Sequence, residues 1–341
     1  MKSPFILLLL SFAMLSACQT KTKPQPMKKY EWLPYCSAPL LHPNEIINGH
    51  LYLEDGDQVY IPSSGINRMV WGKEGSLHTQ GEDFKAIPVK LEIIWASYLE
   101  NKYYGGSWDL PVEKIRALFE QGIQDWSTKK QITFSGVVVG CAPGGVVVVW
   151  VQSYNNQVEV ARFQATETQV DIRKFVPGNP TITQKEYFDV SQSEPEAYEN
   201  LKDKGLQLEL WDLYRKKYNW RTGIEIANYQ SERYALEMFN GETEDIFGAP
   251  LTKNEFKQRA IPRTLYFLIK DKTGKRTVFN FESLNEKELF GLFAQIDPSK
   301  PLEVILRMNE DLTNRKLVLK QEDKEFLIKK VDFENTWEYK D

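Results

Sequence analysis

The sequence has few residues of the kinds that usually carry catalysis or bind metals. It contains only three cysteines and three histidines, and the histidines, His42, His50 and His78, lie 8 and 28 positions apart. That spacing does not match a zinc motif, and no G-x-S-x-G elbow is present. A cysteine nucleophile would have to pair Cys36 or Cys141 with one of these histidines, and nothing in the sequence orients such a pair. We therefore predict a protein that is not an enzyme and that has no catalytic residue, no metal and no cofactor.

The sequence also lacks a basic cluster and a long internal apolar run. Its formal net charge is −4, so it offers no electrostatic footprint for nucleic acid, and we expect no nucleic-acid partner. After the first residues, the longest run of purely apolar residues is 146–151, Val-Val-Val-Val-Trp-Val. That length suits a strand, whereas a membrane-spanning helix needs about 20 apolar residues.

The N-terminus is the segment with the clearest meaning. Lys2 precedes a short apolar stretch, residues 5–14, which fits the central region of a secretory signal. The next residues, Leu15-Ser16-Ala17-Cys18, resemble the lipobox of bacterial lipoproteins. The resemblance implies cleavage before Cys18 and acylation of its thiol; the alternative is an ordinary signal peptide in which Cys18 is incidental. Gln19 stands where an aspartate would retain such a protein at the inner membrane, so the resemblance implies an outer-membrane lipoprotein facing the periplasm, lipid-anchored at Cys18.

Residues 18–29 read as a lipidated tether after the signal peptide, 1–17. From Thr20 the sequence is TKTKPQPMKK, which has no apolar periodicity, two prolines and four lysines. Such a composition indicates a solvated spacer. The lysines could alternatively contact anionic lipid headgroups.

Two cysteines remain beyond the anchor, Cys36 and Cys141. An exported compartment is oxidising and permits a disulfide between them. Their distance along the chain leaves open whether they meet, so we name them as a possible disulfide.

The main internal pattern is a repeat. Ile87-Pro88 recurs as Ile261-Pro262, 174 residues later. The identities that follow at this offset, without a gap, are Leu91 with Leu265, Leu110 with Leu284, Leu118-Phe119 with Leu292-Phe293, and Gln121 with Gln295. Upstream, Tyr30-Glu31-Trp32 resembles Tyr218-Asn219-Trp220 at an offset of 188. The change of offset predicts a longer loop in the first copy, placed at 63–83. The alternative is a chance likeness between two ordinary units of two strands and a helix.

The repeated unit predicts an α+β fold of two tandem similar domains, each a mainly antiparallel sheet with one packed helix. In the second copy, strands are expected over 264–269 and 275–281, followed by a helix after the capping pattern at Ser283. The expected divisions are a first repeat domain, 30–175, a connector, 176–217, and a second repeat domain, 218–341. Leu- and Trp-rich residues 206–214 indicate that the connector packs against the body of the protein.

An aromatic segment is the candidate partner-binding site. Tyr103, Tyr104 and Trp108 lie in a strand interrupted by two glycines, Gly105 and Gly106. If exposed, such side chains would be good interface anchors. The alternative is that they pack within the sheet, as the corresponding strand of the second copy does.

The whole mature chain resembles an uncharacterised family of bacterial lipoproteins, one of the groups defined by a domain of unknown function. The residues that carry the resemblance are Tyr30 and Trp32, Ala38-Pro39 with Pro43, Leu91 to Trp95, Glu100 with Lys102 to Tyr104, and Leu210-Trp211 through Tyr218 to Arg221. Members of that family are often encoded beside secreted phospholipase toxins of the type VI system. The resemblance therefore implies a cognate immunity role and brings no catalytic residues with it.

Three classes of function follow from these features. The leading hypothesis is an immunity protein that binds and neutralises a secreted toxin, possibly a type VI phospholipase. The alternative is an envelope housekeeping lipoprotein that acts as a scaffold or binds a glycan or lipid. A third hypothesis is an enzyme with an unfamiliar site.

Overall fold

A computed structural model describes residues 27–339, apart from residues 64, 76–78, 80 and 177. The predicted signal peptide, Cys18 and most of the tether lie outside the described residues. The first half of the chain, residues 27–175, contains β1 (Tyr30–Glu31), β2 (Leu33–Ser37), β3 (Asn44–Leu53), β4 (Gln58–Tyr60), β5 (Phe84–Lys85), β6 (Pro88–Ser97), β7 (Lys102–Asp109), α1 (Val112–Gln121), β8 (Ile123–Gln124), β9 (Gln131–Ile132), β10 (Gly136–Ala142), β11 (Val146–Ser153), β12 (Asn156–Gln164) and β13 (Thr166–Thr168). The connector, 176–217, contains α2 (Gln184–Phe188), α3 (Pro195–Lys204) and α4 (Leu210–Tyr214).

The second half, residues 218–339, follows a similar order of strands and helices. It contains β14 (Tyr218–Glu225), β15 (Tyr229–Met238), β16 (Thr243–Phe247), α5 (Gly248–Lys253), β17 (Lys257–Arg259), β18 (Pro262–Asp271), β19 (Arg276–Phe281), α6 (Glu286–Phe293), β20 (Leu302–Arg307), β21 (Lys316–Gln321), β22 (Lys324–Ile328) and β23 (Thr336–Glu338). More residues are in strands than in helices, so the structure is consistent with the predicted α+β class. The expected strands at 264–269 and 275–281 are confirmed as β18 and β19. Helix α6 begins two residues later than predicted, because Asn285 and not Ser283 caps it by accepting from the Glu288 N–H.

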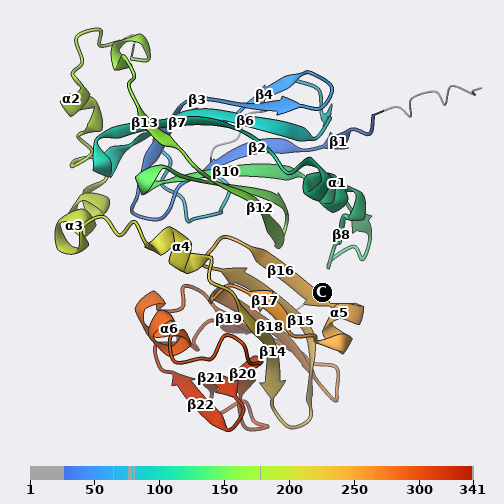
Figure 1. The fold of residues 1–341 in the computed structure, drawn as a ribbon. Helices are drawn as coiled ribbons and strands as arrows, with labels where there is room; N and C mark the ends of the chain where they lie inside the picture. Colours follow the sequence, from blue (N-terminus) through green and yellow to red (C-terminus); the bar gives the residue numbers. More distant parts are fainter. Residues whose placement is uncertain (1–26, 64, 76–78, 80, 177, 340–341) are drawn as a thin grey trace, which may run out of the picture.

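Each half contains two sheets that face one another. In the first half, the strand order β13-β7-β6-β3-β4 packs against β2-β10-β11-β12, and α1 closes one end of the core (Figure 1). In the second half the orders are β23-β19-β18-β15-β16 and β17-β14-β20-β21-β22. In both halves, the strand of the second group that comes earliest in the chain runs parallel to one neighbour, β2 to β10 and β14 to β20. The remaining pairs are antiparallel. Strand order and direction therefore recur.

Contacts between side chains recur at the same places. The indole N–H of Trp32 donates to the Ala86 carbonyl at 3.1 Å, and that of Trp220 donates to the Ala260 carbonyl at 3.0 Å. A cation follows in both halves, since Lys85 donates to the Trp32 carbonyl and Arg259 donates to the Trp220 carbonyl. The paired positions are those that the offsets of 188 and 174 relate in the sequence.

The aromatic packing beneath the helices also recurs. The ring centroids of Tyr30 and Phe119 lie 4.9 Å apart, and those of Tyr218 and Phe293 lie 5.0 Å apart. Both phenylalanines are buried on the inner faces of α1 and α6. The repeated Tyr and Phe residues therefore pack each helix against the first strand of its half.

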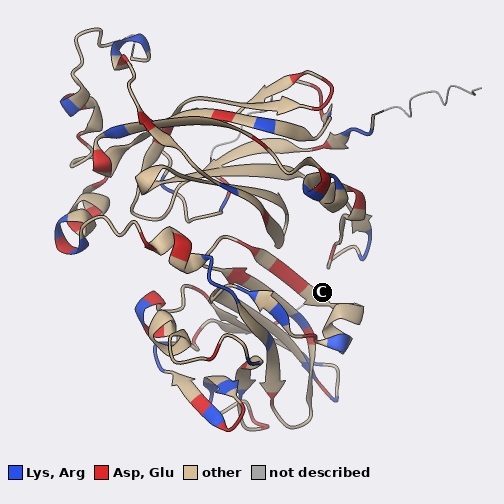
Figure 2. Cartoon of the chain, viewed as in Figure 1, with Lys and Arg blue, Asp and Glu red and all other residues tan. Residues whose placement is uncertain are grey.

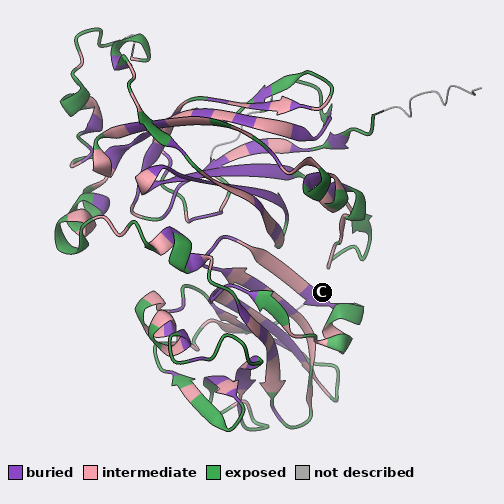
Figure 3. Ribbon diagram, viewed as in Figure 1, coloured by how far each residue is buried: buried purple, intermediate pink, exposed green. Residues whose placement is uncertain are grey.

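The two halves are joined more closely than the tandem plan implied. Strand β12 of the first half pairs with β16 of the second through Gln157 and Thr243, which extends one sheet over nine strands. Strands β10 and β11 are buried along their whole length (Figure 3). One face of these two strands, including Val148 and Trp150, belongs to the hydrophobic core of the second half. The halves thus share a core at their junction.

Backbone packing at the junction is very close. Gly72 of the first half and Gly241 of the second both have positive φ, 79° and 86°. A Cβ added to Gly72 would lie 2.5 Å from the Gly241 Cα. Gln157 bridges the two segments by donating to both glycine carbonyls, at 2.7 and 2.6 Å. Only glycine allows the two backbones to approach this closely.

Candidate functional site

The aromatic segment predicted as a partner-binding surface is largely covered. Tyr103 and Tyr104 in β7 are 2% and 7% exposed, so the prediction that they are exposed is wrong. Phe188 of the connector covers Tyr103 at 4.9 Å between ring centroids, whereas Tyr104 lies in the core of the first half and stacks on Trp95 at 5.5 Å. Trp108 is half-buried and stacks on Phe163 at 5.0 Å, inside the first half. All three side chains stabilise the fold.

Burial also changes the chemistry of these tyrosines. It raises the pKa of Tyr103 to about 12, with a further contribution from the nearby Glu45 carboxylate. The Tyr104 hydroxyl donates to Glu100 at 2.8 Å, and its pKa is raised by burial and by that carboxylate. Both phenols are therefore neutral at physiological pH.

The two cysteines lie on neighbouring strands. Cys36 is in β2 and Cys141 in β10, where Cys36 is opposite Val139, two residues from Cys141. Their side chains are buried thiols in the structure, and Cys36 donates to the Asn67 side-chain oxygen at 2.9 Å. Burial raises the pKa of Cys141 well above its ordinary value. A disulfide between the two cysteines stays a prediction.

The described residues of the predicted long loop at 63–83 make contacts in two places. Ile66 packs against the cluster that contains Tyr103, whereas Trp71 and Lys73 lie at the junction with the second half. Trp71 is 3% exposed within the shared core, and its carbonyl accepts from Arg263 at 3.3 Å. Lys73 forms an ion pair with Glu237 of β15. This loop therefore connects the halves.

The most prominent hollow lies at the same junction. Two adjoining cavities, of about 770 and 570 Å³, share the residues Leu40, Val70, Phe239, Arg263 and Glu286. We call them together the junction groove. Its walls come from the first half, the connector and the second half, so no single segment forms it.

The larger cavity has an aromatic wall. The Trp211 ring of α4 lies edge-on to Tyr214 and tilted against Trp71, and its indole N–H donates to the Pro143 carbonyl at 3.0 Å. His42 meets the Trp211 ring edge-on at 5.1 Å. These contacts fix α4 between the halves, which confirms the prediction that residues 206–214 pack down.

His42 is held in one tautomer. Its Nδ1 lies 2.9 Å from the Leu40 carbonyl, which can only accept, so the proton is on Nδ1. Burial lowers the pKa of His42 and outweighs the opposing effect of that carbonyl. The imidazole is therefore neutral at pH 7.

The smaller cavity has a charged floor on β15 and β18. Glu237 is paired with Lys73 and, at 3.2 Å, with Arg263. Burial alone would raise the pKa of Glu237, but the two cations outweigh it and the pKa is lowered. At the border between the cavities, the Tyr214 hydroxyl donates to Glu286 at 2.8 Å. The groove thus combines an aromatic wall with fixed ionic groups.

Two exposed leucines stand at the rim. Leu40 is 58% exposed and lines both cavities, whereas Leu213 is 39% exposed and lines the larger one. Leu40 comes from the first half and Leu213 from α4. Exposed apolar side chains that gather beside a hollow are common where proteins bind partners.

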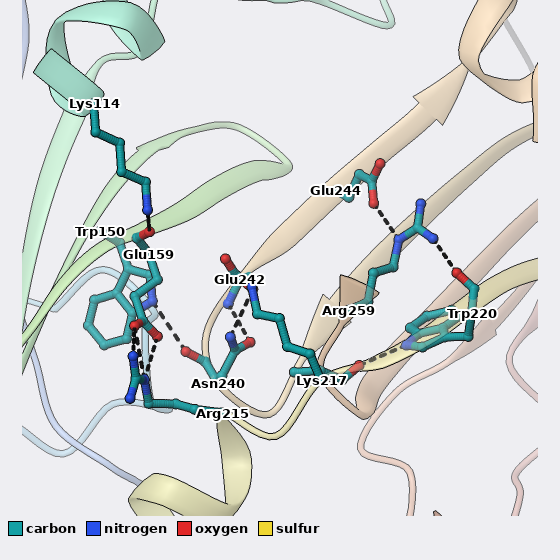
Figure 4. Close-up of polar contacts among 11 residues, drawn as sticks. Lys114, Trp150, Glu159, Arg215, Lys217, Trp220, Asn240, Glu242, Glu244 and Arg259 are labelled. Atoms are coloured by element: carbon teal, nitrogen blue, oxygen red, sulfur yellow. Dashed lines mark hydrogen bonds and ion pairs between the residues drawn. The ribbon is translucent and has the colours of Figure 1, made fainter. Parts of the chain in front are cut away.

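A polar network occupies another part of the junction (Figure 4). Arg215 at the end of α4 makes a bidentate pair with Glu159 of β12, and Lys114 donates to the Glu159 carbonyl at 2.7 Å. Nearby, Lys217 pairs with Glu242 at 2.7 Å. These charges neutralise one another locally and fix the connector. Over the molecule as a whole, basic and acidic residues are interspersed (Figure 2).

Neither a metal site nor a membrane-spanning helix is seen in the part of the chain that the structure describes. No group of three histidine, cysteine, aspartate or glutamate residues there could hold a metal ion. No described helix is long and apolar enough to cross a membrane.

Residues 18–207 match the model of a family described as "protein of unknown function (DUF2931)". The chain belongs to the DUF2931 family. The match covers the first half and most of the connector, and therefore includes the groove residues from Leu40 to Gln207. No curated protein and no solved structure matches this DUF2931 protein.

Sequence reasoning did not find the groove. Its residues lie far apart in the chain, from Pro39 to Phe290, and no single pattern in the sequence joins them. The one available signal was the packing of the Leu- and Trp-rich segment 206–214, which brings Trp211 and Tyr214 to the junction.

Proposed function

We propose that this DUF2931 protein is a lipid-anchored envelope protein that acts by binding a partner protein through the junction groove. The observation that carries the proposal is the rim formed by Leu40 and Leu213 over an aromatic and ionic hollow. Arginine and aromatic residues that converge in one hollow are typical anchors of protein interfaces. Since Trp211 is locked between the halves, little order would have to be gained on binding.

The anchor belongs to the same proposal. The lipobox-like Leu15 to Cys18 supports acylation at Cys18, outer-membrane localisation and a periplasmic face. A chain of 12 residues, 18–29, separates the lipid from β1 and spans at most about 40 Å. Each buried methylene of the lipid contributes about 0.8 kcal/mol to membrane binding. Cys18→Ser should abolish labelling with palmitate, and label retained by that variant would contradict the anchor.

We further propose that the partner is a secreted toxin, so that the protein is an immunity protein. The support is the family resemblance, whose members are often encoded beside type VI phospholipase toxins. Neutralisation of a toxin requires affinity and not turnover. This agrees with a groove in which Glu237 is ion-paired with Arg263 and Glu286 accepts a hydrogen bond from Tyr214.

The test compares rim variants with a matched control. A strain depleted of the protein should be killed by the toxin that is encoded beside it, and the wild-type lipoprotein should rescue that strain. Leu40→Arg and Leu213→Arg should each fail to rescue and weaken toxin binding by roughly tenfold or more. Phe84→Arg should rescue normally, because Phe84 is also exposed, at 57%, but lies in β5 away from the groove.

Two outcomes would contradict the proposal at different levels. If both leucine variants bind toxin and rescue like wild type, the groove is not the contact. If depletion causes no sensitivity at all, the immunity role is wrong. The second candidate, an envelope housekeeping protein that binds a glycan, would then be favoured, since Asn200, Gln207 and Asn285 line the larger cavity beside its aromatic wall.

We also propose that the halves are two copies of one domain, in tandem. The support is the shared strand order and the equivalent hydrogen bonds that Trp32 and Trp220 make in their own halves. The test is to superpose β6–β7–α1 on β18–β19–α6 in a crystal structure of the whole chain. Different folds for these two segments would contradict the duplication.

A further inference from the structure

The internal junction joins two strand edges whose equivalents at the ends of the molecule are open. Strand β12 of the first half pairs with β16 of the second. By its place in the strand order, β12 corresponds to β22, and β16 corresponds to β4. Both β22 and β4 are terminal strands of their sheets in the described structure. The molecule therefore has two open strand edges, β22 and β4. They are equivalent to the two edges, β12 and β16, that pair at the junction.

Local geometry supports this correspondence. At β4 and β16, the Leu53 N–H donates to the Asp57 carbonyl at 2.8 Å, and the Met238 N–H donates to the Glu242 carbonyl at 2.9 Å. The turns before β12 and β22 each contain one non-glycine residue with positive φ, Tyr154 and Glu322, at 45° and 53°. Each edge is thus presented by the same turn as its counterpart.

The residues at the open edges differ in charge from the equivalent residues at the junction. Inside the molecule, the two equivalent positions hold charges with local partners, Glu159 with Arg215 and Asp245 with Arg233. At the open edges these positions hold Leu327 and Tyr60.

Leu327 and Tyr60 are 42% and 43% exposed. Exposed large apolar side chains on unpaired strand edges are characteristic of strand pairing between chains.

We infer that β22 of one molecule pairs antiparallel with β4 of a second copy, which gives a head-to-tail assembly. The register of the internal pair Gln157–Thr243 places Glu325 opposite Gln58. It also brings the exposed Lys329 and Lys330 toward the acidic turn 54–57 of the second copy. Complementary charge would favour this register over its reverse. A contact between two different surfaces leaves one edge of each kind free, so the assembly can continue.

Cysteine cross-linking of the full lipoprotein in membranes tests the inference. Two tagged variants, Glu325→Cys and Gln58→Cys, are expressed together and oxidised with copper phenanthroline. Directly opposed residues of an antiparallel pair lie about 4.5–5.5 Å apart, which is within disulfide range. We expect a dimer that contains both tags and none when either variant is expressed alone. Tyr52→Cys with Gln58→Cys in one chain is the positive control, because these residues are partners in the β3–β4 hairpin.

Further variants distinguish specific pairing of the two strands from disulfides formed by random collision of two molecules. Glu167→Cys lies on the open strand β13 and should not link to Gln58→Cys. Adding Leu327→Asp should reduce the specific dimer by roughly tenfold, because this register places position 327 beside the acidic turn 54–57 of the second copy and like charges repel. Three outcomes would overturn the inference: a Glu325→Cys homodimer, equal linking from Glu167→Cys, or no mixed dimer while the hairpin control links. None of these readouts depends on a toxin.

Discussion

Replacement of Trp150 tests whether the halves form one cooperative unit. The Trp150 side chain is fully buried, and its indole N–H donates to the Asn240 carbonyl of the second half at 3.2 Å. Its ring meets Trp71 edge-on at 5.0 Å between centroids. Truncation to alanine removes a buried aromatic ring, at a cost of about 3–5 kcal/mol. The lost hydrogen bond adds about 1 kcal/mol.

The expected result is a loss of about 4–6 kcal/mol in the free energy of unfolding for Trp150→Ala. Since whole domains are stable by about 5–15 kcal/mol, such a loss is large. Urea unfolding of the chain from Gln19 onward should be followed by circular dichroism and by hydrogen exchange. Because Trp150 belongs to the core of the second half, peptides from β6 and from β18 should lose protection together.

Trp337→Ala is the matched control, since it also removes one tryptophan but from a site that is 43% exposed. We expect its cost to lie within about 1 kcal/mol of zero. Two separate unfolding transitions, with only first-half peptides affected by Trp150→Ala, would refute the shared core. A cost below about 1 kcal/mol for Trp150→Ala would refute the packing argument itself.

Three further predictions concern single residues. Gly72→Ala should destabilise the protein by about 1–3 kcal/mol more than Gly274→Ala in thermal unfolding, because both glycines have positive φ but only at Gly72 does the new Cβ meet the Gly241 backbone; equal costs would contradict this. Burial lowers the pKa of His42, so the folded state resists its protonation and stability should fall as pH drops below about 6.5, at up to about 1.4 kcal/mol per pH unit. His42→Asn should flatten that slope between pH 7 and 5, and an unchanged slope would exclude His42 as its source. Cys141 should react slowly with iodoacetamide at pH 8 in the native chain and rapidly in urea, as read by mass spectrometry, because burial raises its pKa; fast native labelling would be inconsistent with that environment.

The sequence predicted local structure well where one residue type dictates it. The strand signals at 264–269 and 275–281 agree with the structure, where they appear as β18 and β19. The failure at Ser283 was local, because two candidate caps, Ser283 and Asn285, lie within one turn and only packing selects between them. Ser283 adopts a positive φ of 52° and precedes the helix.

The exposure of side chains could not be predicted in the same way. Tyr103 alternates along its strand as an exposed residue would, and only the return of the connector buries it under Phe188. The junction groove depends on the same kind of long-range contact, because Leu40, Trp211 and Arg263 meet only when both halves and the connector are in place. A local sequence pattern carries no information about such long-range contacts.

The contacts that recur and those that do not recur divide the molecule into two kinds of surface. Trp32 and Trp220 make the same hydrogen bond in the two halves because each ties the first strand of its half to the segment before β6 or β18. Gln157 and Trp150 have no such counterparts, because Glu325 and Val318 take their places in the second half. Both of these residues lie where the halves meet, since Gln157 pairs with Thr243 and Trp150 bonds to Asn240. If the two halves are copies of one domain, the inner packing preserved the fold while change at the junction produced a hollow that neither copy could form alone.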